Sequence, residues 1–292
     1  MAHDKVYGIC ESKCKVEVPS LEKHNGDISN LETSMYNLSE SDRDFLTKKI
    51  LLNMGKEVLT SCNRMYKDKT EITTIDYIET YFVTNMSYMF NQCTSLTSIP
   101  NLDTSNVTNI SAMFSVCTSL TSIPNLDTSN VTDMSAMFNK CTSLTSIPNL
   151  NTSNVKNMGN LFRQCTNLTS IPDLNTSNVT NIDYMFDGCT NLTSIPDLDI
   201  NKVKYMTGTL NGCTSLTTFT DNTYAPEGQR WQIKNNVDFS PCPLDRTSIL
   251  KVFNGLETVS SKTIKISSTT NSYLTDEDKA IATNKGWTIE VL

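Results

Sequence analysis

The sequence predicts an α/β repeat protein in which 24-residue units stack into an elongated solenoid. Six cysteines are each separated by 24 residues: Cys93, Cys117, Cys141, Cys165, Cys189 and Cys213. Columns of Leu, Ile, Pro, Val and Phe keep the same step, so the repeat is a pattern of core positions and not only of cysteines. A fixed period of this length is the sequence signature of a solenoid or a related repeat architecture.

One half of each unit is predicted to be a short helix. In residues 107–117 the apolar side chains have helical spacing, and Thr108 or Asn109 can cap the first turn. A helix of about three turns is not stable alone in water, so it must pack on its neighbours. The six cysteines are expected to be buried at the ends of these helices, as small apolar core residues with free thiols.

The other half of each unit is predicted to be a short strand at residues 100–105 and their copies. The two-residue alternation of a strand would turn Leu102 inward and Asn101 and Asp103 outward. A strand and a short helix within 24 residues indicate a leucine-rich-repeat unit. Stacked units would form a parallel sheet on one face and a row of short helices on the other.

The sequence divides the chain into four parts, of which the solenoid is one. Residues 1–38 are polar and are interpreted as an N-terminal arm that attaches the protein to a partner. Residues 39–71 are predicted to be a helical cap over the first coil, because terminal repeats need a cover. Residues 72–220 are the solenoid. Residues 221–292 are expected to hold degenerate repeats and a C-terminal cap.

The C-terminal part is predicted to alternate strands and helices. After an insertion at 221–236, we expect strands at 237–239, 263–266 and 287–292 and helices at 245–255 and 275–285. Glycines follow or end both helices, as is common for helix stops. The last two strands lie 24 residues apart, so the solenoid is expected to continue to the C-terminus.

The central repeat resembles the BspA-like leucine-rich repeats, across residues 83–219, in the variant N-V-T-x-M-x-x-M-F-x-x-C-T-x-L-T-x-I-P. The segment from Leu274 to Trp287 resembles the ends of such proteins from gut bacteria and their phages. The segment from Tyr7 to Lys15 is similar to the start of phage virion proteins. The resemblance implies a surface protein that functions in adhesion and protein binding.

The composition of the chain limits the classes of partner that it is expected to bind. The net charge is −7 and the pI is near 4.9, which argues against binding to nucleic acid or to an anionic membrane surface. No apolar stretch is long enough to span a bilayer, so no membrane insertion is expected. The N-terminus has no secretory signal pattern, so we expect synthesis in a cytoplasm.

Two outward columns are the candidate binding face. They consist of Asn101, Asn125, Asn149, Asp173 and Asp197, and of Asp103, Asp127, Asn151, Asn175 and Asp199. Such oxygen and amide ladders can bind sugar hydroxyls or protein donors, and they can hold hard cations. The alternative is a solvated sheet face on which Asn separates the charges. The Thr-Ser-Asn corner, such as 104–106, is expected to satisfy backbone groups at the turn.

No catalytic site, metal site or cofactor is predicted. The chain has two histidines, His3 and His24, both in the arm, and it lacks the motifs of common hydrolases and nucleotide-binding proteins. A zinc site needs four convergent ligands, which the cysteine column does not provide. Cys10 and Cys14 form a C-x-x-x-C pair that could be a disulfide or part of a metal site, although a packing or anchoring role is favoured.

The expected function is therefore non-enzymatic. The leading hypothesis is a phage virion component, such as a fibre or decoration protein, in which the arm contacts other virion proteins and the solenoid contacts a host surface protein or glycan. The alternative is a bacterial cell-surface or secreted adhesin that binds host protein or glycan. A glycan-active enzyme is a distant third hypothesis. The protein could also form a homo-oligomer.

Overall fold

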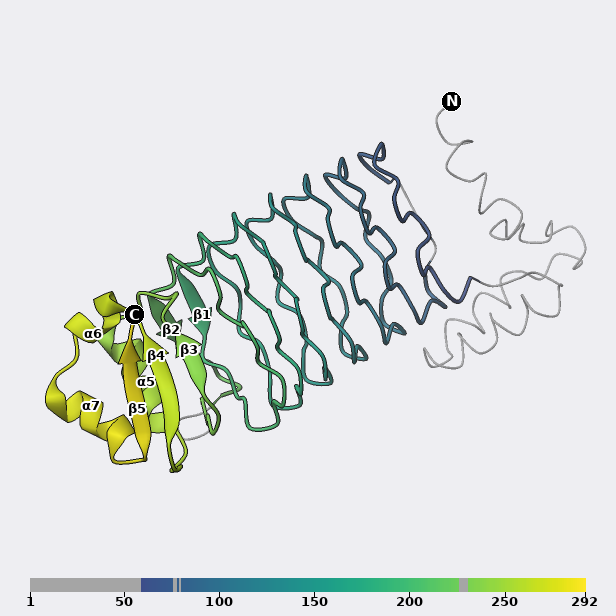
Figure 1. The fold of residues 1–292 in the computed structure, drawn as a ribbon. Coiled ribbons are helices and arrows are strands. Elements are labelled where there is room, and N and C mark those ends of the chain that lie inside the picture. Colours follow the sequence, from purple (N-terminus) through teal and green to yellow (C-terminus); the bar gives the residue numbers. More distant parts are fainter. Residues whose placement is uncertain (1–58, 76–77, 79, 226–230) are drawn as a thin grey trace, which may run out of the picture. The chain divides into compact units, whose positions relative to one another are not determined.

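The computed structural model describes residues 59–75, 78, 80–225 and 231–292. From Ser61 onward the chain forms one unit in which successive coils lie side by side (Figure 1). Backbone hydrogen bonds join residues of neighbouring coils, as from Thr132 N to Thr108 O at 2.9 Å. The structure is thus a repeat protein with a 24-residue period, as predicted. The arm at 1–38 and most of the predicted cap lie outside the described residues.

The predicted helices at 107–117 and its copies are wrong: within the described part of residues 59–225 no helix forms. Each segment is instead a series of turns. Ile110 N and Ala112 N donate to carbonyls of the next coil at 3.1 and 2.8 Å, while Met113 N donates to Ile110 O of its own coil. Alternate donors therefore point along the stack, whereas an α-helix would direct all of them to its own chain.

We call this segment of each coil the turn ladder. It begins at a residue that forms a parallel bridge with its counterparts in the neighbouring coils, and these residues are Ser61, Asn85, Asn109, Asp133, Asn157, Asn181 and Tyr205. The ladder also contains residues with a positive φ at a fixed step, such as Ala112 at 51° and Val116 at 64°. Apolar side chains at helical spacing are buried in this ladder too, so periodicity alone could not distinguish it from a helix.

The predicted strand at residues 100–105 and its copies is also wrong in position. In the described repeats only β1 (Ser194–Pro196) and β2 (Thr218–Thr220) form a ladder, parallel and with Ser194 opposite Thr218. Along this side of the coil the buried residues recur every third position, as at Leu120, Ile123 and Leu126. Across the predicted strand, Leu102 is buried while Asn101 and Asp103 are exposed, so the expected alternation of side chains is confirmed although no strand forms at these residues.

The first coil begins earlier than predicted. Residues 61–71, which the sequence predicts to belong to the helical cap, pair with the following coil. Cys62 N donates to Asn85 O at 2.9 Å, and Tyr66 N donates to Met89 O at 2.8 Å. The turn ladder therefore starts at Ser61, and the boundary at residue 72 is wrong.

The core of the coils consists of columns of similar side chains at equivalent positions. A column of aromatic rings runs through the turn ladders, with neighbouring centroids 5.5 to 5.9 Å apart and nearly parallel planes, and it consists of Tyr66, Phe90, Phe114, Phe138, Phe162 and Phe186. All five phenylalanines are fully buried. The predicted cysteine column is buried as well, so this part of the predicted core is confirmed.

The C-terminal part is an ordinary α/β unit. A parallel sheet in the order β3-β4-β5 is made of β3 (Val237–Phe239), β4 (Lys262–Ile266) and β5 (Trp287–Val291). Helix α5 (Arg246–Gly255) follows β3, and α6 (Ser268–Ser272) and α7 (Asp276–Thr283) follow β4. The predicted strands and both predicted helices are confirmed, while α6 was not predicted.

The 24-residue period does not continue into this sheet. Val237 pairs with Ile264, a step of 27 residues (264 − 237), and Ile264 pairs with Ile289, a step of 25 (289 − 264). The expectation that strands at 264 and 288 would keep the repeat is therefore wrong. Helix α5 follows the extended half of the last coil, because Asp245 N at its start donates to Thr217 O at 2.8 Å, and a unit that contains a helix does not keep the 24-residue length of the coils.

Candidate functional site

The predicted binding face is only partly exposed. Of the first column, Asn101, Asn125 and Asn149 are exposed, Asp173 is half-buried and Asp197 is fully buried. The second column changes in the same direction: Asp103, Asp127 and Asn151 are exposed, Asn175 is half-buried and Asp199 is buried. The accessible part of the face is therefore confined to the coils around residues 101–151.

The second column has a local structural role. Asp103 Oδ1 accepts hydrogen bonds from Ser105 N at 3.0 Å and from Ser105 Oγ at 2.6 Å. Asp127 accepts from Ser129 N at 2.9 Å, and hydrogen bonding by Ser129 lowers the pKa of this carboxyl group. These side chains fix the turn that follows them. Their remaining oxygen is available to a ligand, but their position is set by the turn.

Asp197 is removed from the face by residues from the C-terminal part. Its Oδ1 accepts a hydrogen bond from Trp231 Nε1 at 3.1 Å, and its Oδ2 lies 3.0 Å from Lys251 Nζ. Trp231 is buried against Phe219, with ring centroids 4.5 Å apart. The placement of Asp197 on the exposed face is a correction to the sequence prediction, because the repeat at this position is covered by the insertion.

The corner asparagines join neighbouring coils, as expected for a structural role. Asn130 Nδ2 donates to Ser105 O at 2.7 Å, and Asn154 Nδ2 donates to Ser129 O at 2.7 Å. Each amide therefore satisfies a carbonyl of the preceding coil at an exposed corner. These residues hold the stack together and are poor candidates for ligand contacts.

The cysteine column packs in the core. In every repeat Sγ lies 3.0 to 3.2 Å from a carbonyl 27 residues earlier, as for Cys117 and Phe90 O. The cysteines of the described chain are free and buried, and burial raises the pKa of Cys141 to about 12. No group of metal-binding side chains occurs in the described residues. Cys10 and Cys14 lie outside them.

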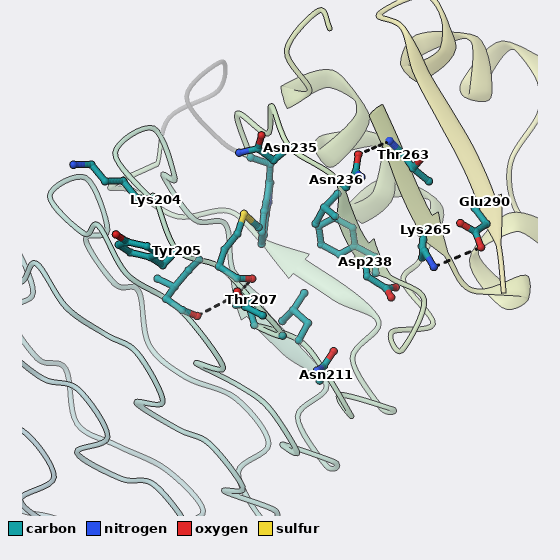
Figure 2. Close-up of a pocket in the computed structure, with 18 residues that line it drawn as sticks. Lys204, Tyr205, Thr207, Asn211, Asn235, Asn236, Asp238, Thr263, Lys265 and Glu290 are labelled. Atoms are coloured by element: carbon teal, nitrogen blue, oxygen red, sulfur yellow. Dashed lines mark hydrogen bonds and ion pairs between the residues drawn. The ribbon is translucent and has the colours of Figure 1, made fainter. Parts of the chain in front are cut away.

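A cavity of about 610 Å³, which sequence reasoning missed, lies where the 24-residue coils end (Figure 2). The last turn ladder forms one wall, with Lys204, Tyr205 and Thr207. The opposite side is formed by β3, β4 and β5, with Asp238, Lys265 and Glu290. Trp231 and Phe239 form part of its apolar lining.

The polar groups of this cavity are partly paired. Lys265 Nζ lies 3.5 Å from Glu290 Oε1, and Asn236 Oδ1 accepts a hydrogen bond from Thr263 N at 2.9 Å. The Tyr205 ring is 58% exposed, which makes it an accessible aromatic surface beside these groups. The signal in the sequence was that Tyr205 stands where six preceding coils carry Ser, Asn or Asp at the bridging position.

Two overlapping stretches of the chain, residues 60–170 and 117–225, match the family described as Mycoplasma protein of unknown function, DUF285. Together they cover more than half of the 292 residues. The chain belongs to this family. Its repeats are similar to leucine-rich repeats, and here they show as a 24-residue pattern of buried Cys and Phe.

The DUF285 match begins at residue 60, next to the first bridging residue, Ser61, and not at the predicted boundary of 72. It ends at residue 225, before the segment that leads to Trp231 and β3. None of the curated proteins matches the chain. Among the described residues, no helix is long and apolar enough to cross a membrane.

Proposed function

We propose that this DUF285 protein is a non-enzymatic binding protein that presents a leucine-rich-repeat solenoid of the BspA-like type. The observation that carries the proposal is the fixed position of the same polar side chain in successive coils. Asn101, Asn125 and Asn149 are exposed at one position of three adjacent coils. A row of amides held at a constant step can bind a polymer or a protein surface at several points at once.

The rigidity of this row supports recognition over catalysis. The coils are joined by backbone bonds on several sides and by corner amides such as that of Asn130. A surface that is already ordered loses little conformational entropy on binding. Repetition also argues against an active site on this face, because the same groups recur in each coil and no one coil is chemically distinct.

The setting we propose is a phage virion, in which the protein is a fibre or decoration component. The segments Tyr7 to Lys15 and Leu274 to Trp287 support it by their resemblance to phage proteins. The N-terminal arm would contact other virion proteins, and the repeat would face a host surface protein or glycan. The alternative is a surface or secreted adhesin of a bacterium, which is favoured by the Mycoplasma origin in the family description.

Peptide mass spectrometry distinguishes a phage virion component from a bacterial adhesin. Density-purified phage particles and washed bacterial envelopes from the same source culture would be compared. Enrichment in particles at the stoichiometry of known structural proteins supports the virion setting. Enrichment in the envelope, with none in particles, rejects it and leaves the adhesin.

The binding face is tested by substitution. Asn125→Arg with Asn149→Arg places two large cations in the row and should abolish attachment to host cells. Thr132→Arg is the control, because Thr132 is exposed on the next segment of the coil. Equal loss of attachment in the control would show that the Asn row is not the binding face.

A further inference from the structure

The last turn ladder has an open edge. In the preceding coil four backbone N–H groups donate to carbonyls of this last ladder at 2.7 to 2.9 Å, and they belong to Ile182, Tyr184, Phe186 and Gly188. The corresponding donors of the last ladder are the N–H groups of Met206, Gly208, Leu210 and Gly212. None of these four has a hydrogen-bond partner among the residues that the structure describes.

The chain itself leaves this edge open. By the 24-residue step, Trp231, Ile233 and Asn235 follow Thr207, Thr209 and Asn211 and would supply carbonyls to the edge. Instead Trp231 N donates to Leu198 O at 3.2 Å, and Ile233 O accepts from Glu257 N at 3.0 Å. Trp231 and Ile233 thus form backbone bonds elsewhere and not with the turn ladder, while α5 covers the extended half of the same coil through Ser248 Oγ, which accepts from Phe219 N.

The open edge lines the cavity of Figure 2. Met206, Gly208 and Leu210 are part of its wall. Met206 is half-buried, whereas its counterpart Ile182 is 1% exposed inside the stack. The cavity therefore offers a row of backbone donors, an apolar floor and the exposed ring of Tyr205 in one place.

We propose that this cavity binds a short peptide segment of another protein, which pairs its alternate carbonyls with the open edge of the last turn ladder. This deepens the proposed function and rests on it, since it names a partner class for a binding protein. Pairing with an exposed backbone edge is a recurrent mode of peptide recognition, in which main-chain bonds supply affinity and side-chain pockets supply specificity.

The stack itself shows which ligand fits the edge. In the coils before it, the same donor row is occupied by carbonyls of every second residue, as from Asp133 to Asn139. A glycan offers hydroxyl groups without this fixed alternation, so the row favours a peptide. In an occupied coil Met134 and Met137, which are three positions apart, are both buried. We therefore expect the ligand to carry apolar residues at this spacing.

The test uses the full chain and a labelled, capped peptide with the sequence of residues 133–140, D-M-S-A-M-F-N-K, and a scrambled peptide as control. We expect saturable binding of the first peptide only. Binding should slow hydrogen exchange at Met206, Gly208, Leu210 and Gly212, while exchange in the buried coils stays unchanged. Tyr205→Asn, which restores the residue type of the other coils, should weaken binding about fivefold by removing an aromatic contact.

Tyr273→Ala is the matched control, because Tyr273 is 51% exposed and does not line the cavity. Binding without slower exchange at the four amides would overturn the proposed pairing. Slower exchange on addition of oligosaccharides but not of the peptide would replace the peptide by a glycan. No binding of either probe, with attachment to host cells intact, would reject the cavity as a site and leave the Asn row as the proposed binding face.

Discussion

Lys251 on α5 forms an ion pair with Asp197, a residue 54 positions earlier in the chain, with 3.0 Å between Nζ and Oδ2. The carboxylate is fully buried, and Lys251 also donates to Phe219 O at 2.7 Å. The ion pair links the C-terminal α/β unit to the end of the 24-residue coils.

Asp197→Ala should destabilise this junction by on the order of 3 kcal/mol, because it leaves a partly buried ammonium group without its buried partner. Chemical denaturation monitored by Trp fluorescence measures the change, since Trp231 also loses its acceptor. Asp173→Ala, at the same position of the preceding coil, is the control and should change stability by less than about 1 kcal/mol. Equal effects of the two substitutions would show that the ion pair does not stabilise the junction.

Asp197 also shows what the sequence could not predict. By the repeat it is equivalent to Asn101, which is exposed, and both residues stand in the same I-P-x-L-D pattern. Its burial depends on Trp231 and Lys251, which follow much later in the chain. A repeat predicts equivalent environments, but the coil at the end of a stack meets a different neighbour.

The period of the core was predictable, while the backbone conformation was not. The columns of Phe and Cys follow from the sequence because burial depends on the side chain. The turn ladder does not, because Ile110, Met113 and Phe114 would be buried in a helix as well. The direction of the Ala112 N–H group distinguishes the turn ladder from a helix, because it donates to Ser135 O of the next coil. Sequence periodicity carries no information on that direction.

The helices of the C-terminal part were predicted correctly because local residues determine where each of them begins. Helix α5 begins at Asp245, whose side chain accepts from Ser248 N, and α7 begins with a capping box formed by Thr275 and Asp278. Such signals are local and have a direct physical cause at a helix end. The cavity beside Tyr205 depends on the path of residues 231–235 and has no local signal of this kind.

The buried cysteines should be unreactive in the folded protein. Burial raises the pKa of Cys93 to about 11 and that of Cys141 to about 12, so the thiolate that reacts is scarce at pH 8. Iodoacetamide labelling with mass spectrometry should show no modification of the six column cysteines in the native state and full modification in denaturant. Intact disulfide-linked peptides between cysteines 24 residues apart would contradict the free thiols of this column.

Removal of one ring from the aromatic column should destabilise the folded protein. Phe138 stacks on Phe114 and Phe162 with centroids 5.9 and 5.7 Å away, and it is fully buried. Phe138→Ala should lower the free energy of unfolding by about 3–5 kcal/mol, because it leaves a cavity between two coils. Asn125→Ala, at an exposed position of the same coil, should change it by less than about 0.5 kcal/mol in the same denaturant titration.

The ion pair between Arg246 and Asp278 makes stability depend on pH in acid. Arg246 donates two hydrogen bonds to the carboxylate, at 2.7 and 2.9 Å, and together with Thr275 N it lowers the pKa of Asp278 from 3.8 to about 2. Because the folded-state pKa is the lower one, the stabilisation is complete above pH 3.8 and is lost as the pH falls through about 2.

Asp278→Asn should therefore lower Tm at pH 7, and the difference from the unmodified protein should shrink between pH 4 and pH 2. Thermal unfolding followed by circular dichroism across this range measures both. Asp276→Asn is the control, because Asp276 is exposed on the same helix. A Tm difference that stays constant down to pH 2 would mean that the amide disturbs the packing of α7 rather than the charge of Asp278.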